Sequence, residues 1–153
     1  MNYLVTGGAG FIGSHITRAL LQQGANVRVL DNFSSGKRDN LNGLDVEIIE
    51  GDLRDASRVA EAVRGVNIIF HEAAFVSVPE SMEKPQECFD VNVTGTSILF
   101  EAARKAGVQR AVIASSAAVY GDSTAMPRVE DTPRKQLSPY ASSKRVDEMY
   151  AEL

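Results

Sequence analysis

A tyrosine and a lysine stand four residues apart near the end of the chain, at Tyr140 and Lys144. In a helix this spacing puts both side chains on one face, one turn apart. A lysine ammonium close to a phenol favours the deprotonated tyrosinate. Tyr140 is therefore a candidate general base that removes a hydroxyl proton while hydride leaves the same carbon, and Lys144 would also hold the ribose of the hydride acceptor. The pair alone is weak evidence, because such pairs also occur on solvated or packed helix faces.

Two serines, Ser115 and Ser116, strengthen that interpretation. They close the apolar run 110–116, which reads as a β-strand. Ligands of doubly wound sheets bind at the carboxyl ends of the strands. A serine hydroxyl at this point could steady the oxygen on the carbon that is being oxidised.

A glycine-rich turn in residues 3–13 predicts where phosphates would bind. An apolar run is followed by Gly7, Gly8, Gly10 and Gly13 and then by a helical pattern. An early glycine allows a tight turn, Gly10 lets backbone N–H groups approach a pyrophosphate, and Gly13 lets the helix pack on the strand. The positive end of the helix dipole then faces the phosphates. The pattern is not decisive, since such turns also occur where nothing binds.

An acidic residue at the end of the second expected strand favours NAD as the ligand. The strand 27–31 ends on Asp31, 18 residues after Gly13. A carboxylate at this distance accepts hydrogen bonds from the adenosine ribose and repels the extra phosphate of NADP. NADP stays open as an alternative because Lys37 and Arg38 are near, and so does a plain turn role for Asp31.

Strand and helix patterns alternate along the whole chain, which indicates an α/β fold: a doubly wound parallel sheet of about five strands with helices on both faces. Gly24 and Gly65 would end two helices, and Asp55 would cap one. The first expected strand ends before Gly7, and the other expected strands cover 27–31, 46–51, 66–71 and 110–116. The expected helices cover 11–23, 37–41 as one turn, 56–64, 85–106 with a break near 94–96, and the segment from Ser138 and Pro139 onward.

Composition limits the possible functions. The chain has 153 residues, 44% of them hydrophobic and 24% charged, which is typical of one globular domain. A formal charge of −4 predicts no nucleic-acid partner and no anionic membrane surface. No apolar stretch is long enough to span a bilayer, and the single Cys88 cannot form an internal disulfide. We therefore expect a cytoplasmic protein.

A histidine at the end of the fourth expected strand, His71, could suggest a metal or acid–base role. The only other histidine, His15, lies in the first helix, and there is no cysteine cluster. We expect a structural role for His71 and no metal site.

Taken together, these motifs resemble the N-terminal half of the extended short-chain dehydrogenase/reductases, the family of nucleotide-sugar epimerases and dehydratases. The resemblance covers essentially the whole chain, and the motifs occur in the family's order and at fitting separations. They are Thr6–Gly13, Asp31–Gly36, Gly51–Leu53, His71–Ala74, Asn92–Thr96, Ser115–Gly121 and Tyr140–Lys144.

The resemblance implies that residues 1–153 form a NAD-binding Rossmann domain. It implies a catalytic set of Ser116, Tyr140 and Lys144, with the serine placed by counting back four residues from Tyr120. It also agrees with a structural role for His71. The implied cofactor-binding residues are Gly7, Gly10, Phe11, Ile12, Gly13, Asp31, Asn32, Ser34, Gly36, Asp52, Leu53, Ala73, Ala74, Asn92, Tyr140 and Lys144.

The resemblance also narrows the reaction. The family's dehydratases carry an acid pair directly after the catalytic hydroxyl, whereas this chain has Ala117 and Ala118 there. This favours an epimerase of a UDP-sugar, acting by transient oxidation at sugar C4 and hydride return. Another UDP-sugar epimerase or a keto-sugar reductase remains an alternative.

The family's chains are about twice as long, and their second half carries the substrate domain. A UDP-sugar would therefore be a partner of the complete protein, and Glu80 and Ser81 are the only candidate sugar contacts in this part. A stand-alone NAD-binding module without turnover is the alternative. An exposed apolar edge of the truncated sheet would favour a dimer or another homo-oligomer.

Overall fold

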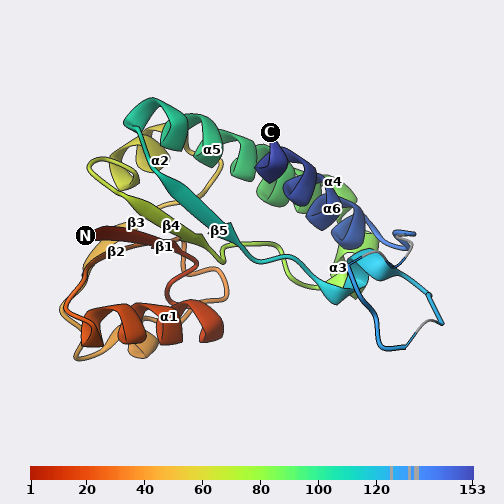
Figure 1. Ribbon diagram of the computed structural model, residues 1–153, viewed down its shortest axis with the longest axis horizontal. Helices are drawn as coiled ribbons and strands as arrows, with labels where there is room; N and C mark the ends of the chain where they lie inside the picture. The colour runs from red at the N-terminus through yellow and green to blue at the C-terminus, as the bar shows by residue number, and fades with distance from the viewer. Residues whose placement is uncertain (125, 131, 133–134) are drawn as a thin grey trace.

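A computed structural model describes residues 1–124, 126–130, 132 and 135–153 and shows a parallel five-stranded sheet with helices on both faces (Figure 1). The strand order is β3-β2-β1-β4-β5, so the chain runs outward from β1 to one edge and then crosses back to build the other. The predicted fold class is thereby confirmed. The strands are β1 (Asn2–Thr6), β2 (Asn26–Asp31), β3 (Glu47–Glu50), β4 (Ile68–His71) and β5 (Arg110–Ile113).

The two faces of the sheet are covered by different helices. In Figure 1, α1 (Phe11–Gln22) lies on one side of the strands, and α2 (Ala56–Ala62) and α5 (Gly95–Ala106) lie on the other. Side chains of β1 alternate between these layers, because successive residues of a strand point to opposite faces. Leu4 belongs to the hydrophobic cluster between the sheet and helices α2 and α5, and Val5 belongs to the cluster between the sheet and α1.

The long helical segment that leads to the last strand is widened in its middle. It consists of α4 (Pro85–Phe89), a π turn over Asp90–Thr94 and α5. The helix predicted over 85–106 is therefore confirmed, and the irregularity covers Asp90–Thr94, which overlaps the break expected near 94–96 at Thr94. A π turn inserts one extra residue into the helix, and here the turn contains the buried Asn92.

The last helix, α6 (Pro139–Glu152), runs beside α4 (Figure 1). The hydroxyl of Ser138 accepts a hydrogen bond from the Ala141 N–H, and Pro139 follows at the first helical position, as predicted. The predicted cap on α2 is also present, since the Asp55 carboxylate accepts hydrogen bonds from two backbone N–H groups.

Some elements differ from the sequence-based expectation. A short helix, α3 (Val78–Glu83), was not expected, and β5 ends at Ile113 rather than at residue 116. Beyond β5, the segment leads into a 3-10 turn, η3 (Ala117–Tyr120). The turn expected over 37–41 is the 3-10 turn η1 (Arg38–Leu41).

Two further facts concern the surface. The described part of β5 pairs only with β4, and Val112 on it is exposed. Among the described residues, no helix is both long enough and apolar enough to cross a membrane.

Candidate functional site

A cleft of about 470 Å³ opens at the carboxyl ends of β1, β2 and β4. This is the edge where ligands of doubly wound sheets bind. Most of the residues expected to bind cofactor line it, although Asn92, Tyr140 and Lys144 do not. Those that line it are Gly7, Gly10, Phe11, Ile12, Gly13, Asp31, Asn32, Ser34, Gly36, Asp52, Leu53, Ala73 and Ala74.

The glycine turn between β1 and α1 has no room for side chains. Gly7 has φ +66°, and a Cβ there would lie 2.6 Å from the Ala73 nitrogen. A Cβ on Gly13 would lie 2.2 Å from the Gly7 carbonyl oxygen. Both glycines are therefore required by the close approach of backbone to backbone, as the sequence pattern predicted.

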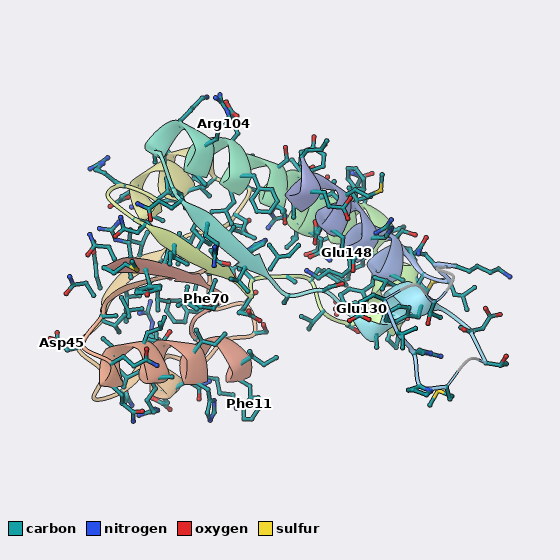
Figure 2. All side chains as sticks on the ribbon, in the orientation of Figure 1. Phe11, Asp45, Phe70, Arg104, Glu130 and Glu148 are labelled. Carbon is teal, nitrogen blue, oxygen red and sulfur yellow. The ribbon has the colours of Figure 1, made fainter. Side chains whose placement is uncertain are left out.

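The start of α1 carries no side-chain cap, unlike α2, α3 and α6. Gly10 is its N-cap, and the next three residues all line the cleft. Backbone N–H groups in the first turn of a helix lack partners within the helix and attract anions. The residues present thus fit a diphosphate. Figure 2 shows Phe11 projecting from this end of α1, where its ring is mostly exposed.

Asp31 ties the glycine turn to the loop after β2. Its carboxylate accepts hydrogen bonds from the Ala9 N–H at 2.9 Å and from the Phe33 N–H at 2.8 Å, one on each oxygen. Each oxygen keeps a second lone pair, so the group can still accept from ribose hydroxyls. Gly36 packs closely against the Asp31 carboxylate, since a Cβ on Gly36 would lie 3.0 Å from Oδ1 of Asp31.

Asp52 is held by a residue that the sequence reasoning missed. Arg54 donates to both carboxylate oxygens, at 2.8 and 2.7 Å, and Asn32 donates to one of them. These hydrogen bonds hold the pKa of Asp52 well below its usual range. Asp52 is therefore an ionised acceptor in the cleft, and Arg54 lines the cleft with it.

Of the two cations next to the ribose loop, Lys37 and Arg38, the arginine is already engaged. Arg38 forms an ion pair with Glu50, and its guanidinium lies 4.0 Å from the centre of the Phe33 ring. An arginine that binds the extra phosphate of NADP would have to leave both partners. The arrangement therefore favours NAD over NADP.

The Tyr–Lys pair lies on α6, as predicted, but its surroundings differ for the two residues. Tyr140 is half-buried, and its backbone N–H donates to the hydroxyl of Ser81. Lys144 is buried, and its Nζ lies 3.1 Å from Oδ2 of Asp147. The Ser81 hydroxyl also donates to the Val78 carbonyl, so this buried serine serves the fold rather than a sugar.

The two serines after β5 have different partners. Ser115 donates to Glu148 at 2.6 Å, and Figure 2 shows Glu148 on α6. Ser116 accepts a hydrogen bond from the Ala118 N–H and begins η3. Ser116 is half-buried, and the described contacts give its hydroxyl no carboxylate partner. It is therefore better placed than Ser115 to act as the free hydroxyl.

Asn92 is an internal clamp. Its amide oxygen accepts from the Phe75 N–H at 2.7 Å, and its amide nitrogen donates to the Phe75 carbonyl and to the Ser143 hydroxyl. The side chain is 1% exposed. It therefore joins the loop after β4 to α6, and its expected contact with cofactor would be indirect.

His71 is buried against Thr6 and Thr96, with ring nitrogens 2.6 and 2.9 Å from their hydroxyl oxygens. Burial, assisted by the charge of Lys144, lowers its pKa to about 3, so the ring is neutral. These contacts fit the structural role expected from the sequence. No group of three or more His, Cys, Asp or Glu side chains within the described ranges could hold a metal ion.

Some lining residues were not among the expected cofactor contacts. Glu72 lies within the motif at the end of β4, and burial raises its pKa. Glu87 and Val91 come from the helix on the far wall, which only the fold brings to the cleft.

The parallel sheet, the uncapped glycine turn and the acid at the end of β2 define a Rossmann-type dinucleotide-binding domain. Comparison with known proteins gives the family. The model of the NAD dependent epimerase/dehydratase family matches residues 3–152, and the chain belongs to that family.

Similar proteins carry more specific names. A UDP-glucose 4-epimerase of Erwinia amylovora is 42% identical over 94% of this chain and 45% of its own length. A structure of the Thermus thermophilus UDP-glucose 4-epimerase in complex with NAD is 44% identical, with a TM-score of 0.93, over 99% of this chain and 50% of that one. A UDP-N-acetylglucosamine 4-epimerase from Methanobrevibacter ruminantium, in complex with UDP-N-acetylmuramic acid, is 38% identical with a TM-score of 0.93, over 99% of this chain and 49% of that one. The chain spans about half the length of these relatives.

Proposed function

We propose that this chain is the NAD-binding half of a UDP-sugar 4-epimerase of the UDP-glucose 4-epimerase type. The observation that carries the proposal is the cleft in which an uncapped helix start faces Asp31 across a turn too tight for side chains. The diphosphate would lie at Gly10–Gly13, and the adenosine ribose at Asp31. The NAD-bound Thermus relative supports NAD as the cofactor.

The catalytic work would fall to Tyr140, Lys144 and Ser116. Bound NAD would accept hydride from sugar C4 and return it. In this proposal Tyr140 takes the proton of the C4 hydroxyl, and the Lys144 ammonium favours the tyrosinate and holds the ribose. The Ser116 hydroxyl donates a hydrogen bond to the C4 oxygen while C4 is oxidised.

The sugar itself is less defined than the cofactor. Epimerisation is favoured over dehydration because Ala117 and Ala118 follow Ser116. The similarity to a UDP-N-acetylglucosamine 4-epimerase keeps an N-acetylated sugar as a second candidate.

The experiment separates binding from turnover. The purified chain is titrated with NADH by fluorescence and is incubated with NAD and UDP-galactose, and UDP-glucose is assayed. Binding with conversion that Tyr140→Phe abolishes supports the epimerase, whereas binding without conversion supports a cofactor-binding module. Failure to bind NADH would refute both.

A homo-oligomer and a cytoplasmic location belong to the same proposal. The unpaired side of β5 in the described part of the chain and the exposed Val112 support self-association. Light scattering that finds a stable monomer would contradict it.

A further inference from the structure

Asp147 is a buried carboxylate for which neither the fold nor the proposed reaction has yet given a use. It lies on α6 three residues after Lys144, and the two side chains are 2% and 4% exposed. Oδ2 accepts from the Lys144 ammonium at 3.1 Å, and Oδ1 makes no hydrogen bond of ordinary geometry within the described residues.

This carboxylate costs stability. Burial raises its pKa despite the attraction of Lys144, so the ionised form of Asp147 is harder to accommodate in the folded chain than in the unfolded one. Buried ion pairs often contribute less to stability than apolar residues of the same volume. A group that breaks the packing rules in this way points to function.

A chain of hydrogen bonds leads from the cleft to Thr96, which lies next to Asp147. Ala73 lines the cleft, and its N–H donates to the Thr6 hydroxyl at 3.2 Å. The ring nitrogens of His71 lie 2.6 Å from the Thr6 hydroxyl oxygen and 2.9 Å from that of Thr96. Thr96 favours the ionised form of Asp147 and so lowers its pKa, although burial raises that pKa overall.

Lys144 has donors to spare. An ammonium has three N–H bonds, and the one described hydrogen bond of Nζ goes to Asp147. One fixed contact restrains the flexible side chain and leaves donors for the two hydroxyls of a ribose.

We propose that Asp147 is a positioning residue, whose carboxylate, supported through Thr96 and His71, fixes the Lys144 ammonium for the ribose of a bound dinucleotide. The inference rests on the proposed function, since it needs Lys144 to bind NAD. It predicts that Asp147 acts on the cofactor only through Lys144. If the ion pair were purely structural, replacing Asp147 would change the free energy of unfolding, but Asp147 and Lys144 would show no energetic coupling in cofactor binding.

The test is a double-mutant cycle on NADH affinity, measured by fluorescence titration of the full chain, with urea unfolding of every variant. Asp147→Asn keeps the size and removes the charge, and we expect it to weaken NADH binding about tenfold. In the Lys144→Met background the same change should alter the NADH affinity by less than about twofold. Glu152→Gln removes an exposed carboxylate of the same helix and serves as the control, with unchanged affinity.

A second variant keeps the test decisive if Asp147→Asn does not fold. Thr96→Val removes the hydroxyl beside the carboxylate, and we expect a weaker effect of about threefold that also disappears in the Lys144→Met background.

The outcomes separate the two proposals. Two outcomes overturn only the role of Asp147. In the first, Lys144→Met weakens NADH binding but Asp147→Asn binds as the unmodified chain does. In the second, Asp147→Asn has its full effect even in the Lys144→Met background. Wild-type affinity of Lys144→Met, or no NADH binding by the unmodified chain, overturns the proposed function and this inference with it.

Discussion

Replacing Gly13 by alanine should weaken both cofactor binding and the fold. The new Cβ would lie 2.2 Å from the Gly7 carbonyl oxygen and 2.8 Å from the Gly8 Cα. Both contacts are with backbone, so no side chain can rotate away and the turn itself must move by roughly 1 Å. Overpacking of this kind costs about 1–3 kcal/mol. A displacement of that size in a binding loop can reduce function by about a hundredfold, so we expect NADH affinity to fall by about tenfold to a hundredfold.

The control is Gly24→Ala at the other end of α1. Gly24 has φ +75° but nothing lies within 4 Å of a Cβ placed there. Alanine should cost about 1–2 kcal/mol of stability for the left-handed conformation and leave NADH affinity unchanged. Urea unfolding and fluorescence titration of both variants measure the two effects separately. A Gly13→Ala chain that binds NADH within about twofold of the unmodified chain would refute the close-approach reasoning.

Three further predictions concern stability, each measured by urea unfolding. Ser138→Ala removes the cap that accepts from the Ala141 N–H and should cost about 1 kcal/mol, whereas an unchanged value would show that the cap contributes nothing. Thr17→Val replaces a buried hydroxyl that has no partner in the described part of the chain, so stability should stay the same or rise by up to about 1 kcal/mol, and a large loss would reveal a missed partner. Burial lowers the His71 pKa from 6.5 to about 3, so the unfolded chain takes up a proton first as the pH falls below 6.5. The free energy of unfolding should therefore fall by at most about 1.4 kcal/mol per pH unit between pH 6.5 and about pH 3. His71→Gln should lack that part of the pH dependence, and identical pH profiles would contradict a buried neutral ring.

The sequence was sufficient to predict the sheet and most of the residues that line the cleft at its carboxyl edge. Alternating apolar runs set the parallel strands, and the spacing from Gly13 to Asp31 set the wall of the cleft, because both depend on local periodicity and backbone geometry. The predicted bounds were too long for β3, β4 and β5. For example, β5 ends at Ile113, and Ser115 beyond it donates to Glu148 on α6.

The contacts between distant segments could not be predicted in this way. Asn92 was expected at the cofactor, yet it clamps Phe75 to Ser143, partners that are 17 and 51 residues away. Arg54 and Asp147 carry no motif, and their importance follows only from which charged groups the fold brings together. The role of Tyr140, Lys144 and Ser116 in catalysis stays a prediction.

The central position of β1 has a consequence for biosynthesis. Its first neighbour, β2, follows soon in the chain, but its second neighbour, β4, is complete only at His71. While the ribosome is adding the residues between these strands, one edge of β1 has no hydrogen-bonding partner and the apolar face destined for α5 lies open. The nascent chain must therefore keep this strand from pairing with other molecules until β4 has emerged.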